Sequence, residues 1–323
     1  MFKKNKVAII SLAALLLVAI IVFLNNRDFT LDKSEASFII PDTSAISKIK
    51  VLNADSSFVL TKVYGKWVYN NSITANPELT DIIFRILTQA EIKSAVPKAS
   101  LLQVAQIVNS KGSEVEVFSD KKVIKHYKIF ADPLLHKVFM LMYNSKKPYE
   151  VSLPSFQGNF AGVFKAPRSL WHNRAIFNEF TNSVGSIKVT QYGNVEKWFE
   201  MDFNEKGQPA IKTNKQAEIQ NINKEAIDAY FYCIKRFKVE TFVDNADSLK
   251  KIFASQKPVN NVVITDITGK QVAFDLYPMT GNTKENNQLI LNYCYLLINK
   301  KDVAIAKYIE TDPITRDVNF FIK

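Results

Sequence analysis

Short runs of alternating apolar and polar residues recur along most of this chain, and they predict an antiparallel, β-rich fold. Ile46-Ser-Lys-Ile-Lys-Val51 recurs as Val184-Gly-Ser-Ile-Lys-Val189. Because successive strand side chains point to opposite faces, such runs are typical of strands with one buried face. Further strand-like runs follow each copy, at 58–63 and 67–69 after the first and at 198–203 and 210–212 after the second. The recurrence in order indicates an internal repeat.

In each copy, the strands are followed by a segment whose apolar residues recur with the period of a helix. The first predicted helix runs from Pro77 to about Ile92, with Asn76 as its N-cap and Pro77 in its first turn. The second begins after Asn223, also a capping residue, and reaches about Phe237. A helix at the same place in both copies strengthens the repeat.

Two more hairpins complete each copy. They are predicted at 115–130 and 138–151 in the first copy and at 262–277 and 293–306 in the second. The chain is therefore expected to hold two tandem α+β domains, 46–155 and 184–323. Each would be an antiparallel sheet backed by one main helix.

The apolar run from Val7 to Leu24 contains Ser11 as its only polar residue. A helix of this length reaches roughly 27 Å, close to the roughly 30 Å hydrocarbon core of a bilayer. We therefore expect a transmembrane signal anchor, preceded by a cytoplasmic tail at 1–6 and followed by a spacer arm at 25–45. A cleaved signal peptide is the competing interpretation, although the exit of the run lacks small residues.

The charge flanking this run predicts its orientation. Three lysines precede it, and lysines are retained on the cytoplasmic side, so the C-terminal bulk is expected in the periplasm.

The chain has 323 residues, 47% of them hydrophobic, enough for two domains with cores. Its net charge of +11 favours anionic lipids, wall polymers or nucleic acid as partners, or simply a solvated lysine-rich surface. An extracytoplasmic location disfavours nucleic acid. Whether Cys233 and Cys294 pair stays open.

The sequence contains no familiar catalytic motif. The glycines form no phosphate-binding loop, and the three histidines match no familiar zinc spacing. The carboxylate pair Glu114 and Glu116 is expected on a solvated strand face rather than in a glycosidase site. The sequence therefore predicts no enzyme, no metal and no cofactor.

The segment 156–183 between the copies is rich in aromatic and basic residues. One interpretation is a connector whose aromatic side chains pack between the domains. The other is a contact surface for a partner or polymer, for which the candidate residues are Phe160, Lys165, Arg168, Trp171, His172 and Arg174.

A resemblance to a bacterial family rests on the pattern that these runs form. Its elements are Ile46-x-x-Ile49-x-Val51, then Leu60-x-Lys62-x-x-Gly65-x-Trp67, then the helix start Asn76-Pro77. The chain resembles an uncharacterised envelope domain family, in its Bacteroidota form, that accompanies gliding-motility-type ABC transport auxiliary proteins. The resemblance implies an extracytoplasmic location and membership of a membrane complex, and no catalytic residues.

These observations predict a membrane-anchored, extracytoplasmic, non-catalytic protein that binds a protein partner or an envelope polymer as part of an ABC-type transport or envelope complex. The alternative is an enzyme acting on cell wall or polysaccharide with a site lined by 156–180. A third possibility is a structural accessory that acts through its single helix.

Overall fold

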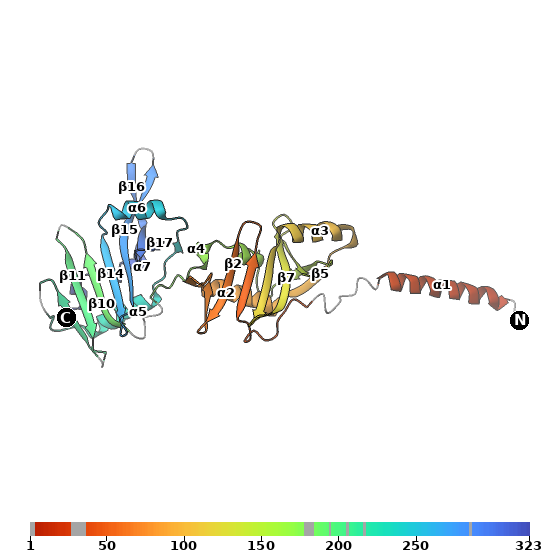
Figure 1. The fold of residues 1–323 in the computed structure, drawn as a ribbon, viewed down its shortest axis with the longest axis horizontal. Coiled ribbons are helices and arrows are strands. Elements are labelled where there is room, and N and C mark those ends of the chain that lie inside the picture. Colours follow the sequence, from red (N-terminus) through yellow and green to blue (C-terminus); the bar gives the residue numbers. More distant parts are fainter. Residues whose placement is uncertain are drawn as a thin grey trace. The chain divides into compact units, whose positions relative to one another are not determined.

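The structure is a computed structural model. It describes residues 4–26, 37–177, 184–193, 195–204, 207–215, 218–283 and 286–323. The chain divides into two compact units, Met1–Ala166 and Pro167–Lys323, and each is described by itself (Figure 1).

The first unit is built on a nine-stranded sheet in the order β4-β3-β2-β1-β6-β7-β8-β9-β5. Every pairing in it is antiparallel. Its strands are β1 (Lys48–Leu52), β2 (Ser57–Val63), β3 (Lys66–Tyr69), β4 (Ile73–Thr74), β5 (Glu91–Ala95), β6 (Ser113–Ser119), β7 (Lys122–Asp132), β8 (Lys137–Met142) and β9 (Tyr149–Ser152).

The second unit has an eight-stranded sheet in the order β12-β11-β10-β14-β15-β16-β17-β13, again antiparallel throughout. Its strands are β10 (Val184–Gln191), β11 (Lys197–Phe203), β12 (Pro209–Thr213), β13 (Thr241–Phe242), β14 (Asn260–Asp266), β15 (Gln271–Thr283), β16 (Asn286–Ile298) and β17 (Asp302–Lys307).

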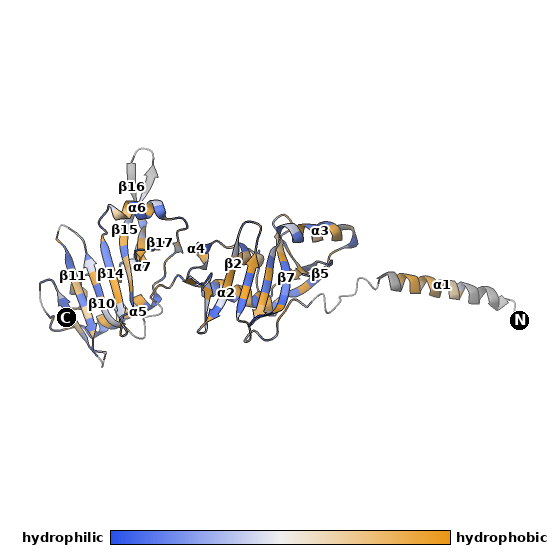
Figure 2. Ribbon diagram, viewed as in Figure 1, coloured by the Kyte–Doolittle hydropathy of each residue, from blue (hydrophilic) through white to orange (hydrophobic). Residues whose placement is uncertain are grey.

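The two sheets share one topology. The second strand order follows from the first when each strand is replaced by its counterpart, and β4 is the one extra strand. The counterparts are β12 for β3, β11 for β2, β10 for β1, β14 for β6, β15 for β7, β16 for β8, β17 for β9 and β13 for β5. The strands alternate between apolar and polar residues along their length (Figure 2). This alternation gives each sheet apolar residues to bury on a chosen face.

A capped amphipathic helix covers one face of each sheet. Helix α2 (Pro77–Gln89) buries Ile83, Ile86 and Leu87, and the Asn76 side chain accepts a hydrogen bond from the Glu78 amide. Helix α5 (Lys224–Arg236) packs into a core with strand residues of β10, β11, β14 and β15. The Asn223 side chain accepts from the Ala226 amide. Both predicted N-caps are confirmed.

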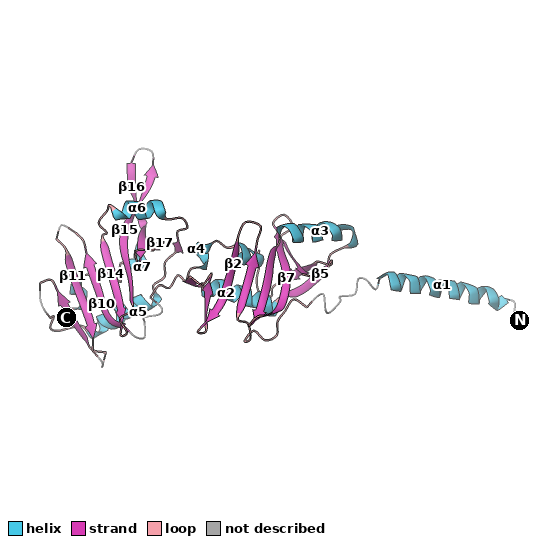
Figure 3. Ribbon diagram, viewed as in Figure 1, coloured by secondary structure: helices cyan, strands magenta, loops and turns pink. Residues whose placement is uncertain are grey.

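A second helix, which the sequence patterns did not predict, lies on the opposite face. Helix α3 (Lys98–Lys111) contacts β7 and β8, and α6 (Asp247–Ala254) packs with Tyr277, Tyr295 and Leu297 (Figure 3). Leu276, next to Tyr277, belongs instead to the core under α5. Each sheet is therefore covered on both faces rather than by one main helix.

The remaining helical turns are short. They are η2 (Phe160–Lys165), α4 (Arg168–Trp171), α7 (Tyr308–Thr311) and η3 (Val318–Phe321). Cys233 and Cys294 are both free thiols.

The N-terminal helix requires a correction. Helix α1 covers Lys4–Asn26, but no helix in the described part of the chain is long and apolar enough to cross a membrane. The expected transmembrane anchor at 7–24 is therefore wrong. The periplasmic location, which rested on it, stays a prediction.

The predicted tail and spacer lie partly outside the described residues, which omit 1–3 and 27–36. The described end of the spacer belongs to the first unit. Phe38 is 2% exposed and meets the rings of Tyr127 and Tyr149 edge-on at 6.4 and 6.2 Å. The Ile40 amide donates to the Leu87 carbonyl of α2.

Candidate functional site

A cavity of about 470 Å³ lies beneath α3 in the first unit. Small-molecule sites in proteins commonly have volumes of roughly 300–1,000 Å³. Its walls come from β5, α3, β7, β8 and β9: Ser94, Ala95, Val96, Pro97, Ser100, Gln103, Val104, Ile107, Phe130, Asp132, Leu135, Lys137, Phe139 and Glu150. The wall is mostly apolar, with its polar groups concentrated on a few residues.

Helix α3 forms the roof. Ser100, Gln103, Val104 and Ile107 lie three or four residues apart, so they share one helix face, and all of them line the cavity. Leu102 lies on the opposite face of the same helix and is 78% exposed. The helix thus has a cavity face and a solvent face.

The floor is the sheet face that α3 covers. Val108 of α3 packs with Phe139 and Leu141 of β8 and with Val96 in a small core of its own. Phe130 of β7 packs against the same core. This core, against which Leu101 and Val104 also pack, anchors α3 to the sheet, while Ser100, Gln103 and Ile107 line the open space.

Glu150 is the buried charge of this site. Its side chain is 8% exposed, and its Oε2 lies 2.8 Å from Lys137 Nζ while its Oε1 lies 3.1 Å from Lys93 Nζ. Ser94 Oγ donates to Oε2 at 3.3 Å. Burial by itself raises the pKa of Glu150, but the hydrogen bonds and charges of Lys137 and Lys93 outweigh it, so the net pKa is lowered. Glu150 is therefore ionised at neutral pH and held from two neighbouring strands.

Asp132, the other carboxylate of the wall, helps to build the turn between β7 and β8. Its Oδ1 accepts the amides of Leu134 and Leu135 at 2.9 and 3.0 Å. Leu135 is part of this turn, lines the cavity and is 58% exposed. Asp132 thus positions an apolar side chain at the opening.

In the second unit, packed aromatic side chains occupy the position that corresponds to the cavity. Register pairs Val51 with Val115 and Val115 with Tyr127, and it pairs their counterparts Val189, Val262 and Phe274 in the same way. Phe130 lies three residues after Tyr127, as Tyr277 does after Phe274, so these two residues correspond. Phe130 pairs with Phe139 and Tyr277 pairs with Tyr295, so Phe139 corresponds to Tyr295.

On that floor, Phe253 of α6 stacks on Tyr277 with ring centroids 4.2 Å apart and planes inclined by 9°. Its ring lies 5.8 Å from that of Tyr295. Glu150 corresponds by register to Ile305 and Lys137 to Tyr293. The space and its charges therefore belong to the first copy, where no aromatic side chain of α3 lines the cavity.

The candidate residues predicted in 156–183 divide between the two units, and residues 178–183 lie outside the described part. Phe160 of η2 is 4% exposed, and its ring meets Phe156 edge-on at 6.1 Å. Lys165 is exposed and donates from Nζ to the Lys111 carbonyl at the end of α3. These two residues contribute to the first unit.

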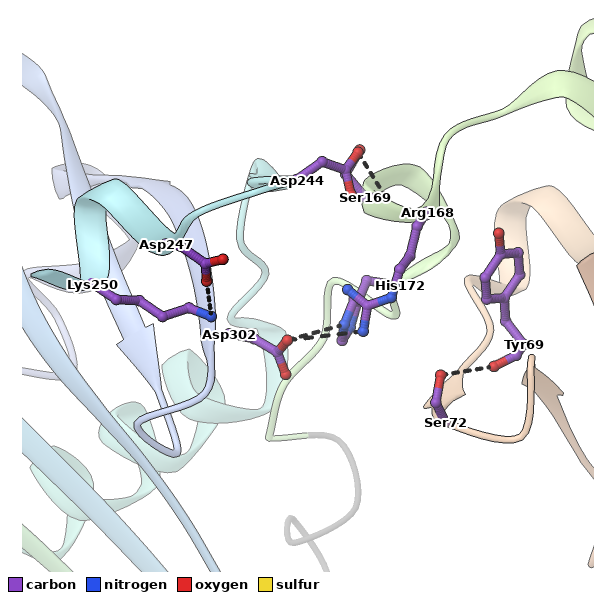
Figure 4. A network of polar contacts seen from close by, with 9 residues as sticks. All are labelled: Tyr69, Ser72, Arg168, Ser169, His172, Asp244, Asp247, Lys250 and Asp302. Carbon is purple, nitrogen blue, oxygen red and sulfur yellow. Dashed lines mark hydrogen bonds and ion pairs between the residues drawn. The ribbon is translucent and has the colours of Figure 1, made fainter. Parts of the chain in front are cut away.

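The other four belong to the second unit. Trp171 is fully buried, and Arg174 Nε donates to the Val239 carbonyl at 2.8 Å. The His172 ring stacks on Phe242 at 3.8 Å, and both His172 and Arg168 point toward Asp302 at 3.9 Å (Figure 4).

Burial lowers the pKa of His172 to about 4, against the opposing charge of Asp302. Its imidazole is thus neutral at pH 7 and held by stacking. Burial and local contacts account for these side chains within the unit.

The carboxylate pair predicted on a solvated strand face takes part in charge pairing on the first sheet. Glu114 Oε1 lies 2.8 Å from His126 Nε2, and Glu116 pairs with Lys50 at 3.0 Å. The His126 ring also stacks on Tyr143 at 3.8 Å. Each carboxylate is matched by a basic neighbour, as cross-strand pairing favours.

Sequence reasoning missed the cavity and Glu150. A signal was present, because Tyr149-Glu-Val151 places a charge in an apolar strand and buried carboxylates need partners. Those partners lie 57 and 13 residues away in the chain, at Lys93 and Lys137, so only the sheet order brings them together.

No protein-family model matches the chain, and neither a curated protein nor a solved structure does. The resemblance to the envelope family stays a prediction.

Proposed function

We propose that this chain is a non-catalytic binding protein whose first unit takes up a small, largely apolar ligand beneath α3. The observation that supports this most strongly is the cavity of about 470 Å³, whose apolar wall includes Val104, Ile107, Phe130 and Phe139. Burial of an apolar ligand there would be driven by its removal from water.

The duplicated architecture supports the proposal by an internal comparison. The second copy stacks Phe253 on the equivalent floor and has Ile305 in the place of Glu150. One topology therefore accommodates a packed version of this region, and the open version occurs where a buried charge lines it.

The polar groups of the cavity support binding rather than hydrolysis. A general base must be able to take a proton from a substrate. Glu150 instead accepts from two lysines and Ser94, and its pKa is lowered. A glycosidase needs one acid with a raised pKa beside a second carboxylate.

Neutral dye binding tests the proposal. The full chain is titrated with N-phenyl-1-naphthylamine, an uncharged probe whose fluorescence rises in apolar surroundings. We expect saturable binding to the native protein. Val104→Phe should weaken it, because the larger ring takes up part of the cavity beneath the roof, whereas Leu102→Phe on the exposed face of α3 should leave it unchanged. Far-UV circular dichroism verifies that both variants fold.

The proposal fails if the native protein gives no saturable signal, or if Val104→Phe binds the dye as the native protein does. A protein partner in an envelope complex and a periplasmic location are separate predictions. Crosslinking in cells followed by mass spectrometry tests the first, and cell fractionation tests the second.

A further inference from the structure

The polar end of the cavity carries an excess of hydrogen-bond donors. Two ammonium groups, Lys93 and Lys137, converge on the single carboxylate of Glu150. An ammonium has three N–H donors, and the contact with Glu150 engages one donor of each lysine. The lysine side chains are 64% and 44% exposed. Asp132, the other carboxylate of the wall, is paired in register with Lys137. Two ammonium groups therefore stand beside two carboxylates, and the excess at this end is of N–H donors rather than of positive charge.

Three of the four carboxylate oxygens at this end have hydrogen-bond or ion-pair partners within the unit. Glu150 Oε1 accepts from Lys93, and Oε2 accepts from Lys137 and Ser94. Asp132 Oδ1 accepts two backbone amides of the β7–β8 turn. A ligand head group beside Lys137 therefore finds N–H donors of that ammonium group still available.

Of the two lysines, Lys137 is the one that lines the cavity. It lines the cavity, whereas Lys93, which contacts the other oxygen of the same carboxylate, does not. Lys137 is also partly exposed, so its ammonium group reaches both the cavity and the solvent. Val96, Ile107 and Leu135 are among the apolar residues of the wall, which also includes Ser100 and Gln103 on the face of α3.

Resting on the proposed function, we propose that the ligand is an anionic amphiphile, with its apolar chain beneath α3 and its acidic head group against Lys137. The head group would accept a charge-assisted hydrogen bond at the opening while the chain is removed from water. The equivalent end of the second unit has Tyr293 and Ile305 in the places of Lys137 and Glu150, and it lacks this charged pair.

Three probes that share one chain and differ only in their head groups test this inference. Decanoate, decanol and decylammonium are titrated into the full chain below their micelle concentrations by isothermal titration calorimetry. We expect decanoate to bind about tenfold more tightly than decanol, as a charge-assisted hydrogen bond implies, and decylammonium to bind most weakly.

Lys137→Met and Lys93→Met form a matched pair of variants, because each removes one partner of Glu150 and only Lys137 lines the cavity. Lys137→Met should abolish the preference for decanoate over decanol. Lys93→Met should retain it. Thermal unfolding of both variants establishes that they remain folded.

The inference is overturned if decylammonium binds as tightly as decanoate. It is also overturned if the two lysine variants reduce the preference equally, since a general surface attraction would then explain it. Saturable binding of the neutral dye without any preference among the three heads would sink this inference alone. Failure of the dye, decanol and decanoate together would remove the proposed function as well.

Discussion

His172 shows how a single buried ring makes stability depend on pH. Its ring stacks on Phe242, and its Nε2 is 3.9 Å from Asp302, too long for a hydrogen bond. Burial lowers its pKa to about 4, whereas Arg168 and Lys301 add further opposition to a positive charge. The folded second unit therefore holds the neutral form.

The consequence for stability follows from proton uptake. As the pH falls below about 6.5 the unfolded chain binds a proton at His172 before the folded chain does, which favours unfolding until the pH reaches about 4. We expect His172→Phe, which keeps the stack on Phe242, to remove up to about 3 kcal/mol of this loss. Denaturant unfolding at pH 7 and pH 4 measures it. A variant whose stability falls as steeply as that of the native protein would contradict the prediction.

Glu150 gives the opposite case, a carboxylate whose folded pKa is lowered by two lysines despite its burial. Its stabilising contribution is present above the ordinary carboxyl pKa and is lost as the pH falls through the lowered value. Glu150→Gln should cost about 1 kcal/mol of unfolding free energy at pH 7. The difference from the native protein should shrink on acidification toward pH 3.

The exposed pair Asp202–Lys212 supplies the control, with side chains 41% and 53% exposed. Asp202→Asn should change stability less than Glu150→Gln does, because solvent screens the pair. Equal effects of the two substitutions would show that burial does not strengthen the Glu150 cluster.

Local chemistry decided which residues could be predicted from sequence. Asn76 and Asn223 were predictable as N-caps because a cap depends only on neighbouring residues. Glu150 was not, since its role depends on lysines of β5 and β8. The candidates Phe160 and Trp171 looked suited to partner contact because aromatic residues suit both interfaces and cores, and burial separates the two.

The strands and helices that could be predicted are likewise those whose local sequence pattern is clear. The runs predicted at 58–63 and 67–69 correspond to β2 and β3, and in β2 buried residues alternate with more exposed ones. The first helix was expected to reach Ile92, but it ends at Gln89 because Ile92 belongs to β5 and pairs there with Val151 of β9. Strand β5 has four exposed residues of five at a sheet edge, so alternation does not mark it.

Helix α3 was missed for a physical reason connected with the cavity. Only Val108 of its fourteen residues is fully buried, whereas Leu102 is exposed and Val104 and Ile107 line open space. A helix that roofs a cavity has no continuous buried stripe to produce a 3.6-residue period. The cavity that supports the proposed function is thus the reason why α3 lacks a clear helical pattern in the sequence.

Substitution of Phe253 tests whether the stability of the second unit depends on the aromatic packing beneath α6. This side chain is 5% exposed and lies on Tyr277 in a small core under α6. Phe253→Ala should cost about 3 kcal/mol, from lost burial and from the cavity left behind. Ile252→Ala, at a neighbouring position that is 47% exposed, should change stability by less than about 0.5 kcal/mol. Equal costs in chemical denaturation would contradict the packing argument.

At the scale of the whole molecule, one topology has been used twice with different consequences. The second unit encloses a large core of its own, from Phe177 and Ile187 through Tyr230 to Phe321. The first buries a comparable set, from Phe38 through Ile86 and Tyr127 to Phe164. Because each unit has a complete sheet and helices on both faces, each meets the ordinary requirements of an independent domain.

Residues 37–166 and 167–323, expressed as separate fragments, should therefore each fold. We expect cooperative denaturant unfolding of both, with near-UV dichroism arising from Trp67 in the first and from Trp171 and Trp198 in the second. A cut inside a unit is the control: residues 37–148 lack β9, which pairs with both β8 and β5, so the edge strand β5 loses its only neighbour. This shorter fragment should lack a cooperative transition. If 167–323 behaves like the shorter fragment while the full chain unfolds cooperatively, the second unit requires the first in order to fold, and the repeat is not a pair of autonomous domains.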